Sequence, residues 1–158
     1  MSRSDKLSKL VAVYDEFQLA LNSLEDGKAT LLRENWPKVR GAYANPIGGV
    51  PRSALAAGME QGLRETPMLF RSMEPVARAI VGKALAMAIE NHYPEFASKD
   101  TARLEKIVNR GYIRGENEYY LVRHRIDVLE GDETRLPELG QCYVLIEQFE
   151  ARPKGGSR

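Results

Sequence analysis

The sequence has a single cysteine, Cys142, among its 158 residues, so a disulfide within the chain cannot stabilise the fold. Its most apolar stretch, residues 79–89, is interrupted by Lys83 and is too short to span a bilayer. The first ten residues lack the apolar segment of a signal peptide. These absences predict a cytoplasmic protein with no membrane partner. A chain of this length can bury a sufficient core without disulfides or metals.

The sequence also lacks a surplus of charge of either sign. It carries 23 Lys and Arg against 22 Asp and Glu. Nucleic-acid binders usually have a basic surplus because neutralised phosphates supply much of their affinity. The last third is nevertheless polarised: residues 99–125 contain seven basic and four acidic side chains, and residues 127–150 contain one basic and seven acidic. This balance argues against nucleic acid and indicates a protein partner, with a basic one suiting the acidic stretch.

Residues that carry catalysis or hold metals are scarce. The two histidines, His92 and His124, do not combine with Cys142 into a recognisable zinc spacing. The pair Gly82-Lys83 lacks the earlier glycine and the following Ser or Thr of a phosphate-binding loop. The sequence therefore predicts no catalytic residue, no metal site and no cofactor. An enzyme without a recognisable motif remains an alternative.

The clearest pattern that is present is an apolar seam near the N-terminus. Its members recur every three or four residues, which predicts one long amphipathic helix: Leu7, Leu10, Tyr14, Phe17, Leu21 and Leu24. Ser4 is the expected N-cap. We expect residues 1–45 to form a helical arm, with a second helix starting at Pro37 and capped by Asn35. The arm either packs on the chain's own core or forms a homodimer through the N-terminal helix.

The rest of the chain predicts an all-α, irregular multi-helix bundle. A loop of Pro and Gly at residues 45–51 separates the arm from a helical core at residues 51–151. Helices are expected from Ser53 to Pro67, from Pro75 to His92, from Ser98 or Asp100 to Gly111, and as a C-terminal hairpin. Residues 118–129 also alternate as a strand would, but their apolar positions fit helical spacing and favour a helix. Residues 152–158 are expected to be a disordered tail.

Small residues recur at helical spacing in the first core helix. Ala54, Gly58 and Gly62 share one face, although glycine in a helix costs roughly 1 kcal/mol relative to alanine. This stripe predicts that another helix, the one starting near Pro75, packs closely against it. Gly58→Leu would then be destabilising.

Two functional hypotheses follow. The first is a non-enzymatic protein-binding module, such as a regulator, adaptor or immunity-type protein. Its expected partner-binding residues lie in the C-terminal hairpin: Tyr120, Arg123, His124, Asp127, Glu130, Asp132 and Glu133. The second is a DNA-binding regulator that uses a helix-turn-helix-like segment at residues 103–126. Against it, Glu116 and Glu118 would repel phosphates. The acids of residues 127–150 could also simply pair with the basic helix before them, which is an alternative to both hypotheses.

Overall fold

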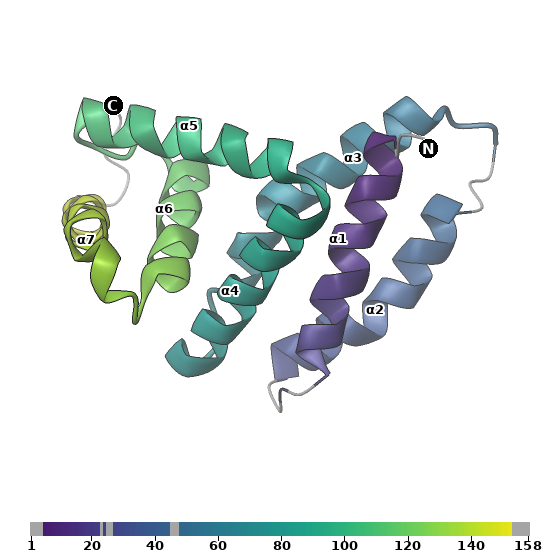
Figure 1. Cartoon of the computed structure of the whole chain (residues 1–158), viewed down its shortest axis with the longest axis horizontal. Helices are drawn as coiled ribbons and strands as arrows, with labels where there is room; N and C mark the ends of the chain where they lie inside the picture. The colour runs from purple at the N-terminus through teal and green to yellow at the C-terminus, as the bar shows by residue number, and fades with distance from the viewer. Residues whose placement is uncertain (1–4, 23, 25–26, 45–47, 153–158) are drawn as a thin grey trace. The chain divides into compact units, whose positions relative to one another are not determined.

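The computed structural model describes residues 5–22, 24, 27–44 and 48–152. Within these ranges every regular element is helical and no strand occurs, which confirms the predicted all-α class. The elements are α1 (Lys6–Leu21), α2 (Gly27–Ala44), α3 (Arg52–Glu65), the 3-10 helix η1 (Thr66–Phe70), α4 (Pro75–His92), α5 (Pro94–Arg110), α6 (Glu116–Leu129), the 3-10 helix η2 (Glu133–Arg135) and α7 (Leu136–Glu150) (Figure 1). Of these described helices, none has the length and apolarity needed to cross a membrane.

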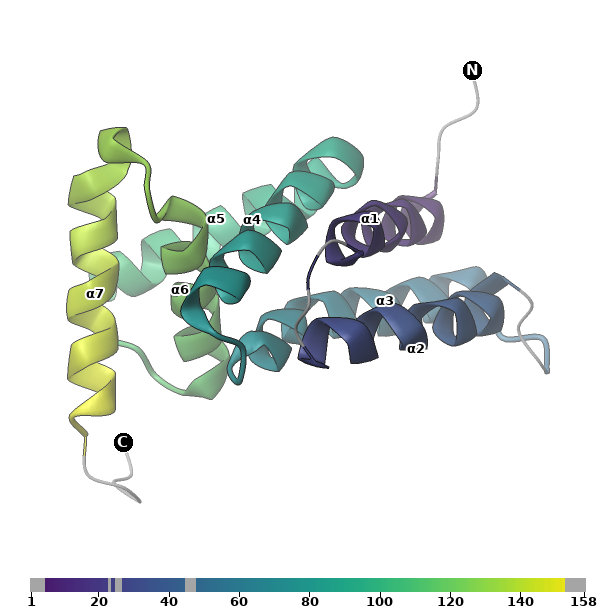
Figure 2. The same cartoon turned by 90° about the horizontal axis from the view of Figure 1, so that it is seen from below.

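Two compact units make up the chain. The first covers Met1–Pro94 and contains α1 to α4, and the second covers Glu95–Arg158 and contains α6, α7 and nearly all of α5. Figures 1 and 2 show the helices of both units. This division differs from the expected one between an arm at residues 1–45 and a core at residues 51–151, because α1 and α2 belong to the same unit as α3 and α4.

Helix α1 is the centre of the first unit and packs against α2, α3 and α4. Four members of the predicted seam are buried, namely Leu7, Leu10, Phe17 and Leu21, together with Val13, which was not among them. The predicted members Tyr14 and Leu24 are half-buried. The run of buried side chains ends with the helix at Leu21. Because the chain itself covers this seam, the apolar face that suggested a homodimer is already buried. The side chain of Asp5 caps α1 by accepting a hydrogen bond from the Ser8 amide at 2.9 Å, and the expected cap, Ser4, lies outside the described residues.

A buried carboxylate fastens three helices of this unit together. Glu60 of α3 is 6% exposed and accepts a hydrogen bond of 2.7 Å from the Tyr93 hydroxyl, directly after α4. Its other oxygen lies 2.7 Å from the Lys6 ammonium at the start of α1. Buried charges are costly unless they are paired, so this arrangement holds the three helices in one register.

Helix α2 runs through Pro37, so the expected start at that residue and the cap at Asn35 were wrong. Proline removes the amide that would bond the carbonyl of Arg33 and normally breaks a helix. Here the preceding residue, Trp36, is 8% exposed and its ring lies against Tyr14 of α1 with 5.0 Å between centroids. Tertiary packing of this large side chain thus outweighs the local preference for a break.

The helix boundaries that were predicted from proline and glycine mostly hold. Helix α4 begins at Pro75 and ends at His92, as expected. Helix α5 begins at Pro94, earlier than the expected caps Ser98 and Asp100, because proline suits the first turn of a helix. Gly111 follows α5 as expected, and its φ of 88° is the left-handed conformation typical of the residue after a helix.

The second unit confirms the predicted C-terminal helical hairpin. Residues 118–129 are helical within α6, which packs against α7. Buried apolar side chains from three helices and the α5–α6 connection form its core: Ile107, Ile113, Leu121, Val122, Ile126, Leu129, Leu139, Cys142, Leu145 and Ile146. The seven-residue tail expected at 152–158 lies outside the described residues except for Arg152.

Candidate binding groove

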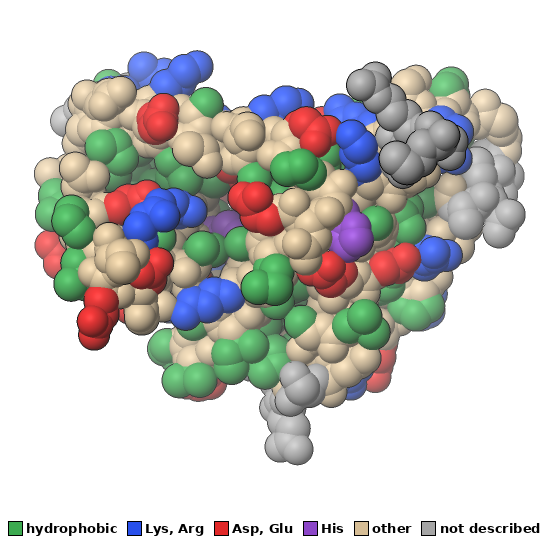
Figure 3. All heavy atoms as spheres, in the orientation of Figure 1, with side chains coloured by type: hydrophobic (Ala, Val, Ile, Leu, Met, Phe, Trp, Pro, Cys, Tyr) green, Lys and Arg blue, Asp and Glu red, His purple; other side chains and the backbone are tan. Residues whose placement is uncertain are grey.

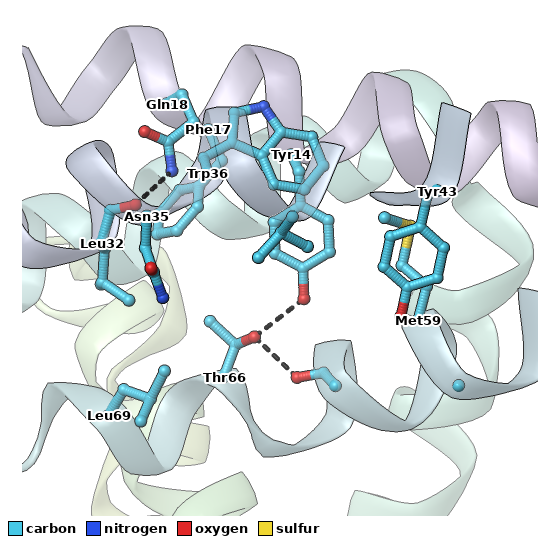
Figure 4. Close-up of a pocket in the computed structure, with 13 residues that line it drawn as sticks. Tyr14, Phe17, Gln18, Leu32, Asn35, Trp36, Tyr43, Met59, Thr66 and Leu69 are labelled. Carbon is cyan, nitrogen blue, oxygen red and sulfur yellow. Dashed lines mark hydrogen bonds between the residues drawn. The ribbon is translucent and has the colours of Figure 1, made fainter. Parts of the chain in front are cut away.

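A concave, mostly apolar groove opens in the first unit among α1, α2 and α3 with η1 (Figure 4). Its volume is about 220 Å³. Four aromatic rings, three aliphatic side chains, one methionine, two glycines, two carboxamides and one threonine line it: Tyr14, Phe17, Gln18, Leu32, Asn35, Trp36, Val39, Tyr43, Gly58, Met59, Gly62, Thr66 and Leu69. We call this the aromatic groove. Pockets of this kind, with a few convergent polar groups, are the usual places for a protein to bind a partner group.

The aromatic wall of the groove is held in place by a charged pair outside it. Trp36 stacks on Tyr14 with an angle of 28° between the rings. The Trp36 indole donates a hydrogen bond of 2.9 Å to Asp15 Oδ1. Arg40 then donates to both oxygens of the same carboxylate, at 3.0 and 3.2 Å. Because the indole hydrogen is already used, Trp36 presents only its ring to the groove.

The opposite wall of the groove, formed by α3, carries few side-chain atoms because two of its residues are glycines. A Cβ at Gly58 would lie 3.7 Å from the Tyr43 hydroxyl, and one at Gly62 would lie 4.0 Å from the Tyr14 hydroxyl. Both distances are ordinary van der Waals contacts, with no helix backbone in between. The prediction that Ala54, Gly58 and Gly62 pack closely on α4 was therefore wrong. Because Gly58 and Gly62 have no side chains, the space next to them stays open and forms part of the groove.

One chain of hydrogen bonds crosses the groove and has a fixed direction (Figure 4). Thr66 Oγ1 lies 2.7 Å from the Gly62 carbonyl, which can only accept, so Thr66 donates its single hydrogen there. The Tyr14 hydroxyl, 3.0 Å from Thr66 Oγ1, must then be the donor in that pair. Burial raises the pKa of Tyr14 to about 12, so its phenol stays protonated at neutral pH.

The remaining polar side chains of the groove are neutral. Gln18 Nε2 donates to the Leu32 carbonyl, one turn before Pro37, at 3.2 Å. Figure 4 shows the Asn35 carboxamide and the Tyr43 hydroxyl turned toward the α3–η1 side. No Lys, Arg, His, Asp or Glu is among the described residues that line the groove. It therefore offers aromatic faces and neutral hydrogen-bonding groups, with no ionic contact.

The acidic residues expected to bind a partner lie in the second unit and mostly have contacts within it. Asp127 is 3% exposed. Glu130 accepts a hydrogen bond from the Tyr143 hydroxyl, and Asp132 caps η2 by accepting from the Thr134 amide at 3.0 Å. Glu133 is exposed. Asp127 lies within α6, and the other three residues lie between α6 and α7. The sequence could not reveal that several of these acids serve as internal acceptors.

The other residues of the expected site share α6 but face different surroundings. Tyr120 is half-buried and its ring meets Tyr119 edge-on, with 5.2 Å between centroids. Arg123 is half-buried as well. Burial, with a smaller contribution from Arg125, lowers the pKa of His124 to about 4, so this imidazole is neutral at pH 7. A neutral imidazole in this position adds no positive charge to a nucleic-acid or protein contact.

Ion pairs within the second unit engage much of the basic segment. Arg125 lies 3.0 Å from both oxygens of Glu138, and Arg135 lies 3.1 Å from the second oxygen of the same carboxylate. Burial opposes ionisation of Glu138, but the two guanidinium groups outweigh it and lower its pKa. Arg110, the last residue of α5, pairs with Glu118 in the first turn of α6. The pairing of acids with the basic helix, which the sequence left as an alternative, is therefore present here.

The residues considered for metal or thiol chemistry have structural surroundings. His92 Nε2 lies 2.9 Å from Glu16 Oε1 in the first unit. Cys142 is 2% exposed, and burial with the charge of Glu138 raises the pKa of its thiol. A protonated, buried thiol is a poor nucleophile. In the part of the chain that the structure describes, no cluster of three or more His, Cys, Asp and Glu could hold a metal ion.

Sequence reasoning missed the aromatic groove as a site. The signal was there, because Gly58 and Gly62 were recognised as an unusual pair within one helix. Trp36 and Tyr43, however, were placed in a region expected to be interrupted at Pro37, so their side chains could not be assigned to a helix face opposite the glycines. Comparisons with models of protein families, with curated proteins and with solved structures gave no match to this chain.

Proposed function

We propose that this chain is a non-enzymatic protein-binding module, in the manner of a regulator, adaptor or immunity-type protein, and that it receives a large uncharged side chain of its partner in the aromatic groove. The observation that carries the proposal is the groove itself: four aromatic rings beside a wall lowered by two glycines. Interfaces derive most of their affinity from a few large side chains that enter such pockets.

The partner contact is assigned to the groove rather than to the acidic stretch for an electrostatic reason. Acids that already accept hydrogen bonds, or that pair with Arg125 and Arg135, attract a basic partner less strongly because part of their negative charge is already compensated. Figure 3 shows acidic and basic side chains interspersed on the face drawn, a pattern that suits neither a basic protein nor DNA. A large surface patch of acidic residues would favour a basic protein, and a large patch of basic residues would favour DNA.

The experiment is a selection of peptides on the full chain from a displayed random library, followed by affinity measurement on the peptides that emerge. Gly58→Leu fills the groove from α3. Ala57→Leu is the matched control, because Ala57 is exposed, lies on the same helix and is outside the groove lining. We expect peptides with a large uncharged side chain that bind wild type and Ala57→Leu equally but lose at least tenfold in affinity for Gly58→Leu, which corresponds to about 1.4 kcal/mol. Peptides that bind all three proteins alike would overturn the proposal.

A further inference from the structure

The geometry points to a neutral aromatic ring that carries one polar hydrogen as the group that the aromatic groove accepts, supplied by a tryptophan or tyrosine side chain of the partner. This inference rests on the proposed function, which it makes more specific. Three properties of the groove carry it: the absence of charge in its lining, the chemistry of its walls and the direction of its hydrogen bonds.

Charge is the first property. None of the described side chains lining the groove is ionised at neutral pH, since burial keeps the Tyr14 phenol protonated and the other polar groups are amides or hydroxyls. A charged group that enters such a site loses its hydration without gaining an ionic partner, which costs far more than a hydrogen bond returns. The occupant is therefore neutral within the groove.

The walls are the second property. The rings of Tyr14, Phe17, Trp36 and Tyr43, with the thioether of Met59, surround the space. Aromatic pairs and sulfur–aromatic contacts contribute beyond their buried area, whereas an aliphatic group gains from burial alone. The side of the groove at Gly58 and Gly62 has no side chain, which leaves room for a flat ring to enter along α3.

Hydrogen-bond direction is the third property. The Tyr14 hydroxyl gives its hydrogen to Thr66, and Thr66 gives its own to the Gly62 carbonyl, so this pair is fixed. Tyr14 Oη keeps lone pairs and can only accept a further bond. A ligand atom next to it must therefore be a donor, as the N–H of an indole or the O–H of a phenol is. The Tyr43 hydroxyl and the Asn35 carboxamide can donate or accept and do not restrict the choice.

The test is a chemical-shift titration of the isotope-labelled full chain with indole and with 1-methylindole, which has the same ring but lacks the hydrogen. We expect indole to perturb signals of α1, α2 and α3 and to bind roughly three- to tenfold more tightly than 1-methylindole, the factor that one neutral hydrogen bond contributes. In Tyr14→Phe the two affinities should converge, which a steric effect of the methyl group would not produce. Gly58→Leu should abolish both, and Ala57→Leu neither.

Equal affinities of indole and 1-methylindole for the wild-type chain would overturn the inference, as would perturbations confined to α5, α6 and α7, or no perturbation at the solubility limit of indole. A titration with N-acetyltryptophanamide shows whether the ring still enters when it is attached to a peptide backbone. Its exclusion, with free indole bound, would contradict the assignment to a partner's side chain. Selected peptides anchored by leucine would leave the proposed function standing and overturn this inference. The expected indole titration without any selected peptide would support the ring chemistry of the groove but overturn both the proposed function and the assignment of the ring to a partner's side chain.

Discussion

Single residues of α3 set the balance between stability and an open groove. Gly58 and Gly62 are helical, have ordinary φ angles and meet nothing closer than a tyrosine hydroxyl when a Cβ is added. Replacing either by alanine in a helix interior reduces the conformational freedom of the unfolded chain. We therefore expect Gly58→Ala and Gly62→Ala each to raise the free energy of unfolding by about 0.5–1 kcal/mol, measured by urea denaturation.

Gly111 provides the contrast for that measurement. Its φ of 88° is one that alanine rarely adopts, so Gly111→Ala should lower the free energy of unfolding by roughly 1 kcal/mol. A loss of stability in Gly58→Ala would instead restore the earlier expectation of a tightly packed helix at this face.

His124 should make the stability of the second unit depend on pH. Its folded pKa of about 4 lies below the ordinary value of 6.5, so between these values the unfolded chain binds more protons than the folded one. Stability contributed by the neutral imidazole is therefore complete above pH 6.5 and is lost as the pH falls toward 4, with a limiting slope of about 1.4 kcal/mol per pH unit. Urea denaturation of the wild type and of His124→Gln at pH 7, 6 and 5 checks this. A constant stability difference between the two proteins across this range would contradict the prediction.

At the scale of elements, the contact of Glu60 with Lys6 and Tyr93 fastens α1, α3 and the end of α4. Tyr93→Phe removes the hydroxyl that donates a hydrogen bond of 2.7 Å to Glu60, and leaves a carboxylate that is 6% exposed with one hydrogen bond fewer. We expect a loss of about 1–3 kcal/mol in the free energy of unfolding. Tyr112→Phe is the control, because Tyr112 is 43% exposed and lies in the other unit. A difference of less than 0.5 kcal/mol between the two variants would show that Glu60 does not depend on this bond.

Elements whose apolar periodicity is regular could be predicted from the sequence, and elements decided by tertiary contacts could not. The seam of α1, the proline at the start of α4 and the glycine after α5 each act locally, and the structure confirms them. Helix α2 is different, because Trp36 packing against Tyr14 overrides the break that Pro37 favours. The same distant contact builds one wall of the groove, so the error in the fold and the missed site have one cause.

At the scale of the whole molecule, each unit contains one natural probe. Trp36, the only tryptophan, lies in the first unit, and Cys142, the only cysteine, is buried in the core of the second. Ile126→Ala creates a cavity in the second core, where Ile126 is 2% exposed, and should cost about 2–5 kcal/mol there. We expect the urea midpoint measured by Cys142 labelling to fall more than the midpoint measured by Trp36 fluorescence. Equal shifts of the two midpoints would show instead that the units unfold as one.

The glycines of α3 also have a consequence for how this protein would respond to selection. Heat resistance and groove binding place opposite demands on Gly58 and Gly62, because any side chain that strengthens the helix also occupies the space between it and the aromatic wall. A library of random variants screened only for survival at high temperature should therefore accumulate substitutions at these two positions early. The same library screened for binding to a groove ligand should retain glycine at both.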